Sequence, residues 1–146
     1  MSPDDHFDLS RFRAAQDPVF AAVLAELRSG HKQTHWMWFI FPQLRGLGHS
    51  PTAQFYAIAS RAEALAYLAD PVLGARLQQA TQAMLDVAGK SAHAILGAPD
   101  DLKFHSSMTL FAAVAGATGA PFRAALDRYF AGAPDPRTLS LLSAHP

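Results

Sequence analysis

The sequence of 146 residues contains no cysteine. This absence excludes disulfides, thiolate-bound zinc, iron–sulfur clusters and a cysteine nucleophile. No apolar run approaches the roughly 20 residues that a membrane helix needs, so no membrane partner is expected. The first residues have neither the basic nor the apolar region of a secretory signal, and the expected location is the cytoplasm.

Charge is also scarce. Only 16% of the residues are charged, and Lys plus Arg equals Asp plus Glu at 12 each. A nucleic-acid-binding protein usually carries a basic stripe, and none is present, so nucleic acid is not expected as a partner. Half of the residues are hydrophobic, which is typical of a globular chain, and the length fits a single domain over residues 1–146.

Aspartate or serine followed by proline recurs along the chain and indicates helix starts. These pairs begin at Asp17, Ser50, Asp70 and Asp135. The first side chain caps the helix, and proline lacks only an N–H that would be unpaired there. Ala120–Pro121 and the capping-box pair Ser60 and Glu63 add two further starts.

The stops and the apolar spacing agree with these starts. Glycines at positions 30, 89, 97 and 132 follow periodic segments, where a left-handed residue often ends a helix. Apolar residues between starts and stops recur every three or four positions, and no run alternates with period two. The sequence therefore predicts an all-α fold of about seven helices joined by short loops.

The segment THWMWFIFPQ, residues 34–43, concentrates large aromatic side chains. It is apolar all round as a helix or as a strand, which predicts burial, and Pro42 ends any helix at Phe41. In one interpretation the segment is a core element, and His35 and Gln43 satisfy nearby backbone groups. In the other, Trp36 and Trp38 form a platform for a planar ligand, with His35 and Gln43 as polar contacts at its edges.

The segment DDLKFHSSMTLF, residues 100–111, has helical spacing with one apolar stripe. Its other side carries one lysine and small hydroxyl side chains: Lys103, Ser106, Ser107 and Thr109. Small side chains allow close helix packing, whereas an ammonium with hydroxyl donors suits an anionic ligand. A third interpretation is a Ser–Lys nucleophile pair.

The other polar motifs give weaker indications of a binding site. His31 and His35 have the i, i+4 spacing of metal ligands but straddle a predicted helix break, so neither a metal nor a cofactor is expected. The loop GLGHS, residues 46–50, precedes a helix start. Its two glycines suit either a turn or a set of backbone N–H groups that face an anion.

Three blocks, HWMWFIFPQLRGLGHSPTAQFYAI, AYLADPVLGARL and DDLKFHSSMTLF, resemble a bacterial family catalogued as domain of unknown function 1810. The resemblance runs from about Phe7 to Leu139. It implies a single compact domain of packed helices, loosely reminiscent of helical-repeat stacking, and it brings no established activity or catalytic residue. Some members carry a calpastatin label, which implies an inhibitor of a calcium protease, and nothing in this sequence supports that activity.

Three functional hypotheses follow, and the sequence does not decide whether the protein is an enzyme. The first is a domain that binds or converts an anionic or nucleotide-like small molecule between residues 36–43 and the helix that carries Lys103. Its candidate ligand-binding residues are His35, Trp36, Trp38, Gln43, Tyr56, Lys103, Ser106, Ser107 and Thr109. The second is a protein-interaction module with an exposed apolar groove. In the third, both segments are core and the function lies elsewhere on the surface.

Overall fold

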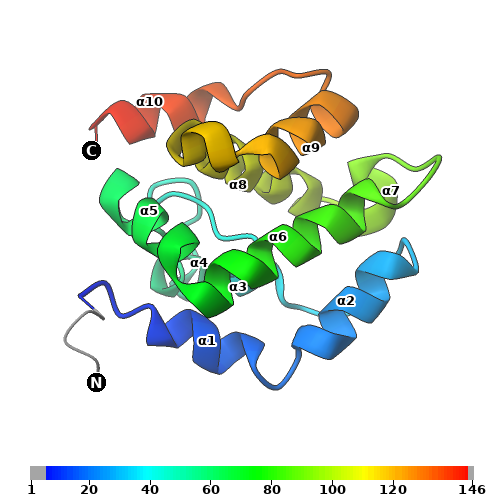
Figure 1. The fold of residues 1–146 in the computed structure, drawn as a ribbon, viewed down its shortest axis with the longest axis horizontal. Helices are drawn as coiled ribbons and strands as arrows, with labels where there is room; N and C mark the ends of the chain where they lie inside the picture. Colours follow the sequence, from blue (N-terminus) through cyan, green and yellow to red (C-terminus); the bar gives the residue numbers. More distant parts are fainter. Residues whose placement is uncertain (1–5, 145–146) are drawn as a thin grey trace.

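Helices make up nearly all of the regular structure in residues 6–144, the part of the chain that the computed structural model describes (Figure 1). They are α1 (Ser10–Gln16), α2 (Phe20–Arg28), α3 (Met37–Ile40), α4 (Pro51–Phe55), α5 (Arg61–Ala69), α6 (Pro71–Leu85), α7 (Ala92–Leu96), α8 (Asp100–Ala115), the 3-10 helix η1 (Gly116–Thr118), α9 (Ala120–Phe130) and α10 (Pro136–Ala144). No strand occurs in this range, and the predicted all-α class is confirmed. None of these helices combines the length and apolarity needed to cross a membrane.

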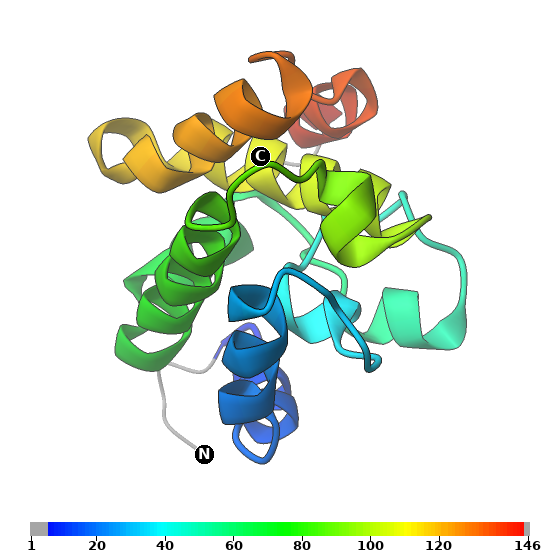
Figure 2. The same cartoon turned by 90° about the vertical axis from the view of Figure 1, so that its right-hand side faces the viewer.

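Helix α8 lies at the centre of the packing. It contacts α5, α7, α9 and α10, and α6 packs between α2, α5 and α9. Figure 1 shows α8, α9 and α10 along one side of the molecule and α1 and α2 along the other, with α6 crossing between them. In the side view of Figure 2, α5 and α6 (green) stand opposite α4 (teal). Residues from distant parts of the chain therefore meet around α8.

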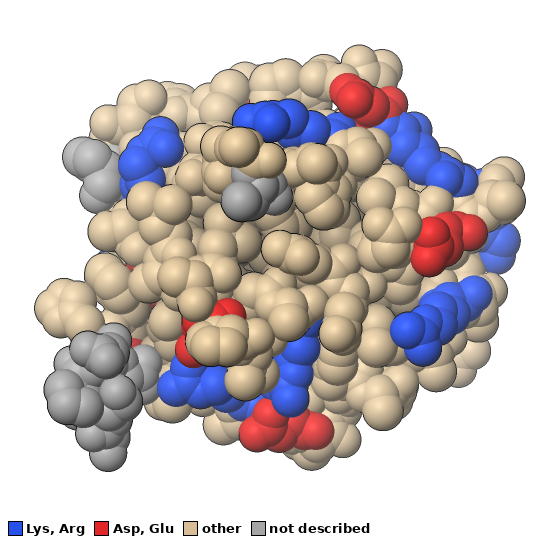
Figure 3. Space-filling view, viewed as in Figure 1, with Lys and Arg blue, Asp and Glu red and all other residues tan. Residues whose placement is uncertain are grey.

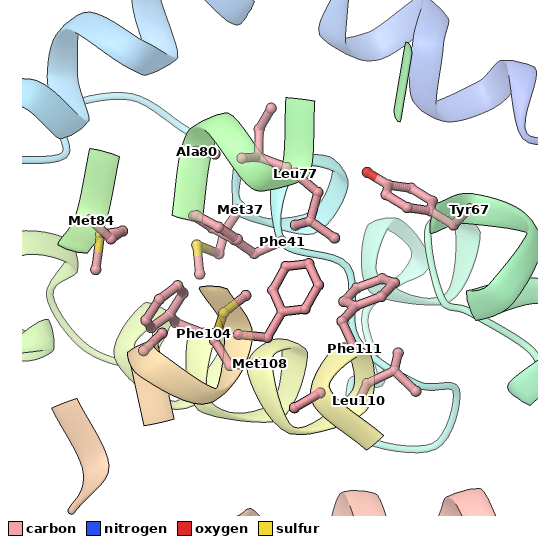
Figure 4. Close-up of a cluster of buried hydrophobic side chains, with 14 of the residues drawn as sticks. Met37, Phe41, Tyr67, Leu77, Ala80, Met84, Phe104, Met108, Leu110 and Phe111 are labelled. Carbon is pink, nitrogen blue, oxygen red and sulfur yellow. The ribbon is translucent and has the colours of Figure 1, made fainter. Parts of the chain in front are cut away.

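The core between these layers is rich in aromatic side chains (Figure 4). The rings of Phe41 and Phe104 meet edge to face, with 4.9 Å between their centroids. The ring centroids of Tyr67 and Phe111 lie 5.4 Å apart. Such pairs contribute beyond the apolar area that they bury. Burial raises the pKa of Tyr67 far above its ordinary value, and its hydroxyl accepts a hydrogen bond of 3.0 Å from Gln16 Nε2. This bond joins α1 to α5 within the core.

Most predicted helix starts are confirmed. The side chains of Ser50, Ser60 and Asp70 accept backbone hydrogen bonds at the starts of α4, α5 and α6. Asp135 Oδ2 accepts the backbone N–H of Thr138 at 3.2 Å in the first turn of α10. The prolines after Ser50 and Asp70 stand in the first turn of their helices, as expected.

The predicted start at Asp17 is wrong. The backbone N–H of Asp17 donates to Arg13 O at 2.9 Å, so Asp17 closes α1, and α2 begins only at Phe20. Its carboxylate pairs instead with Arg76 at 2.8 Å. The same three residues, Asp-Pro-Val, therefore form a turn at 17–19 and a helix start at 70–72. Asp17 keeps the helical backbone conformation of α1, whereas Asp70 has the extended conformation that lets its side chain accept the N–H groups of Val72 and Leu73.

The predicted number of about seven helices is too low. Residues 6–144 form ten α-helices, and no helix start was predicted for α1, α3 or α7. Helix α1 has no side-chain cap, and α3 and α7 contain four and five residues, too few for periodicity to show. On the face of the molecule shown in Figure 3, basic and acidic side chains lie toward the edges, and the centre shows neither.

Candidate functional site

The segment after α3 forms one wall of the candidate site. Leu44 is fully buried and pairs with Ile58, whose N–H donates to Gln43 O at 3.0 Å. Arg45 N donates in turn to Ile58 O at 2.8 Å. Because side chains alternate along an extended segment, Gln43 and Arg45 both point away from the core.

Lys103, near the start of α8, forms the opposite wall. Its Nζ lies 3.7 Å from Asp100 Oδ1 and 5.1 Å from the centre of a Trp38 ring. Asp100 Oδ2 also pairs with Lys32 at 3.0 Å. A cation over an indole face is attracted by the ring quadrupole. Trp38 and Asp100 therefore hold the ammonium of Lys103 between α3 and α8.

A small hollow lies between these walls. Its lining consists of Met37, Trp38, Phe41, Gln43, Ala53, Tyr56 and Lys103. The volume is about 10 Å³, close to that of one water-sized sphere. The amide of Gln43 and the hydroxyl of Tyr56 make no hydrogen bond to any residue in 6–144, so both remain available to a ligand.

A larger cleft adjoins this hollow, and we call it the Lys103 cleft. It is lined by Gln43, Leu47, Gly48, Pro99, Leu102, Lys103, His105, Ser106, Asp135 and Arg137. Its volume of about 440 Å³ lies in the range of small-molecule pockets. Gln43 and Lys103 line both spaces, so the hollow and the cleft adjoin at these two side chains.

The Lys103 cleft has a positive balance of charge. Lys103 comes from α8 and Arg137 from α10, and Arg137 forms no ion pair within the described part of the chain. Asp135 also lines the cleft, but its Oδ2 accepts the Thr138 hydroxyl at 2.6 Å and the Thr138 N–H at 3.2 Å. Two cations therefore face one carboxylate that is already hydrogen-bonded.

A third space, the Arg45 hollow, continues from the cleft. It has a volume of about 360 Å³ and is lined by Arg45, Gly46, Gly48, His49, Gln54 and Ala57. Gly48 belongs to both linings and forms the ridge between them. A Cβ on Gly48 would lie 2.6 Å from the Cβ of Ala53, so only glycine lets the loop pass this close to α4.

Glu26 of α2 fixes the segment that leads into α3. Its Oε1 accepts the N–H groups of Gln33 and Thr34 at 2.7 and 3.0 Å and the indole N–H of Trp36 at 3.0 Å. Its Oε2 accepts the Thr34 hydroxyl at 2.6 Å. Partial burial opposes the charge, but hydrogen bonds from Thr34, Gln33 and Trp36 outweigh it and lower the pKa of Glu26 from 4.5 to about 2.

The sequence matches the family described as "Protein of unknown function (DUF1810)" over residues 6–142. The chain belongs to the DUF1810 family. Its structure is similar to that of the conserved hypothetical protein Rv1873 from Mycobacterium tuberculosis, with a TM-score of 0.92 and 52% identity. That match covers 94% of this chain and 97% of the other. A comparison with curated proteins found no match.

Five of the residues singled out from the sequence line this DUF1810 site. Trp38, Gln43, Tyr56 and Lys103 surround the small hollow, and Ser106 lies in the Lys103 cleft. Tyr56, which follows α4 directly, reaches the hollow together with Ala53 of that helix.

Two candidate residues of the segment 34–43, His35 and Trp36, do not line the site. His35 is exposed and belongs to none of the three linings. Trp36 is only 2% exposed, and its indole N–H is bound by Glu26. The predicted platform of two indoles therefore does not form: Trp36 is core, and Lys103 already covers the half-buried ring of Trp38.

The hydroxyls of α8 serve mainly to hold α10. Thr109 Oγ1 donates to His105 O at 2.8 Å and accepts the N–H of Asp135 at 2.9 Å. Ser106 Oγ lies 3.2 Å from Asp135 Oδ2, and Ser107 is fully buried with no hydrogen-bond partner for its hydroxyl in residues 6–144. None of these hydroxyls bonds to Lys103, so the structure gives no support to a Ser–Lys nucleophile pair.

Several lining residues were not anticipated from the sequence. They are Arg45, Leu47, His49, Leu102, His105, Asp135 and Arg137. The glycine loop at 46–50 was the one available signal, and it lies at the junction of the two larger spaces. Arg137 lines the same cleft as Lys103 only because α10 packs on α8, and no sequence spacing encodes that packing.

Proposed function

We propose that this DUF1810 protein binds a small phosphate-bearing molecule in the Lys103 cleft. The observation that carries the proposal is the convergence of Lys103, Arg137 and the unpaired amide of Gln43 on one cleft of about 440 Å³. Ammonium and guanidinium groups form charge-assisted hydrogen bonds to phosphoryl oxygens, and the amide adds neutral donors.

The contacts around Lys103 favour an anion over a stacked base. The ammonium already lies over the Trp38 ring, and the hollow beside that ring has room for about one water. A nucleobase therefore has no open platform there. Leu47 and Leu102 on the cleft wall suit the carbon skeleton of a phosphorylated metabolite.

A thermal-shift screen tests this proposal. The probes are inorganic phosphate, sugar phosphates and nucleotides, applied to the wild type, to Lys103→Met and to Arg123→Gln. Methionine keeps an unbranched side chain without the charge, and Arg123 is an exposed cation of α9 that lines none of the three spaces. A ligand that binds the native state raises the melting temperature by mass action.

We expect sugar phosphates to raise the melting temperature of the wild type and of Arg123→Gln, and to have little effect on Lys103→Met. The absence of a shift with any probe, or an equal shift in all three proteins, would overturn the proposal.

One observation favours the alternative of a protein partner. Leu102 is 64% exposed and lies on the rim of the same cleft. A partner that seats an apolar side chain there would depend on Leu102 and bind almost independently of salt, since apolar burial is not screened. Leu102→Ser would then abolish binding and Lys103→Met would not, which is the reverse of the result expected for a phosphate ligand.

A further inference from the structure

The Arg45 hollow has the features of a second anion position. Arg45 is exposed and its guanidinium forms no ion pair or hydrogen bond within residues 6–144. His49 adds a second side chain with N–H capacity, and no carboxylate is among the residues that line this hollow. A negative group placed here therefore meets cationic and donor groups without a competing acid.

The loop that follows Arg45 has backbone N–H groups without a partner within residues 6–144, and Gly46, Gly48 and His49 of this loop line the hollow. The N–H groups of Gly46, Leu47, Gly48 and His49 donate to no residue in the described part of the chain. Gln54 Nε2 donates to His49 O at 2.8 Å and ties the loop to α4. Successive unpaired N–H groups beside a cation are a common way for proteins to bind an anion.

The second position adjoins the first along the extended segment that contains Gln43 and Arg45. Gln43 and Arg45 are two residues apart in the extended segment held by Ile58, which separates their Cα atoms by about 7 Å. Gln43 lines the Lys103 cleft, Arg45 lines the next hollow, and Gly48 borders both. One ligand that crosses Gly48 can therefore place one end in each space.

We propose that the ligand carries two phosphoryl groups on one carbon skeleton, one bound by Lys103 and Arg137 and the other by Arg45, His49 and the 46–49 loop. This inference rests on the proposed function, since it assigns the first phosphoryl group to the Lys103 cleft. Two linked contacts raise affinity because the second forms within a molecule that is already bound.

The test is a comparison of fructose 6-phosphate with fructose 1,6-bisphosphate by isothermal titration calorimetry. These probes differ by one phosphoryl group. The proteins are the wild type, Arg45→Gln, Lys103→Met and the control Arg123→Gln. We expect the bisphosphate to bind the wild type and the control at least about tenfold more tightly than the monophosphate, as expected for a second linked contact.

The two variants are expected to respond differently. Arg45→Gln should remove most of the preference for the bisphosphate while it leaves the monophosphate affinity unchanged, and Lys103→Met should weaken both ligands. Equal affinities for the two sugars in the wild type, or an unchanged preference in Arg45→Gln, would overturn the second position and leave the proposed function standing. Binding of neither sugar would count against both proposals.

Discussion

Replacement of Glu26 by glutamine should destabilise the protein, because one carboxylate orders the whole approach to α3. It accepts hydrogen bonds from Gln33, Thr34 and Trp36, and the Trp36 donor belongs to a residue that is almost fully buried. Glutamine keeps one acceptor oxygen but loses the charge and presents an NH2 group in place of the second oxygen.

The size of the effect follows from these bonds. Hydrogen bonds to a charged group contribute roughly 1.5–3 kcal/mol each, but these share one partly exposed carboxylate and are not additive. We therefore expect a net loss of about 1–3 kcal/mol in the free energy of unfolding. For a chain of this length that corresponds to a fall of roughly 3–10 °C in the melting temperature.

The loss should also depend on pH in a defined direction. The pKa of Glu26 is lowered from 4.5 to about 2 by folding, so its contribution is complete above about pH 4.5 and disappears as the pH falls toward 2. Urea unfolding of the wild type and Glu26→Gln should show the full difference at pH 7 and a narrowing difference below pH 4.5.

Asp86→Asn is the matched control, since within residues 6–144 this exposed carboxylate accepts one side-chain hydrogen bond, from Gln82 Nε2 at 2.8 Å. This substitution should lower the free energy of unfolding only slightly at any pH. A difference between wild type and Glu26→Gln that is absent at pH 7, or that does not narrow below pH 4.5, would refute the reasoning.

Two further predictions concern the aromatic block and α8. Iodide should quench the fluorescence of Trp36→Phe, which keeps the half-buried Trp38, far more than that of Trp38→Phe, which keeps the 2% exposed Trp36; equal quenching would contradict the assignment of Trp36 to the core. Ser107→Ala should leave the free energy of unfolding unchanged or raise it by about 1 kcal/mol, because the hydroxyl is buried without a partner. Thr109→Val, which removes two hydrogen bonds at similar volume, should instead lower it by roughly 1–3 kcal/mol, and a larger loss in Ser107→Ala than in Thr109→Val would show that this interpretation is wrong.

Capping chemistry made much of the fold predictable, because it is local. Ser50 and Asp70 bind backbone N–H groups within three residues of themselves, so their roles are visible in the sequence. Asp17 is followed by the same Pro-Val pair as Asp70, but its backbone continues α1 in the helical conformation, and the local pattern misleads there.

The candidate site likewise contains residues that the sequence singles out and residues that only the tertiary packing brings in. Lys103 and Gln43 stand out as polar residues in apolar company, and they meet across the cleft. The sequence could not predict which indole is buried in the core. The four residues of α3 are too few to show a helical periodicity, and the position of the Trp36 indole depends on its hydrogen bond to Glu26 of another helix. Arg137 and Arg45 carry no distinguishing local pattern, and only the packing of α10 and the bridge to Ile58 bring them to the site.

The most direct test of the central claim is a ¹⁵N-correlated NMR titration of the wild-type protein with inorganic phosphate. The two indole N–H signals and the side-chain amides report on separate places, since Trp38 and Gln43 line the small hollow and Trp36 is bound to Glu26 in the core. The account predicts saturable shifts of the Gln43 side-chain amide, the Trp38 indole and the backbone of Arg137, with the Trp36 indole unmoved. Shifts confined to other surfaces, or none at millimolar phosphate, would contradict an anion site in the Lys103 cleft.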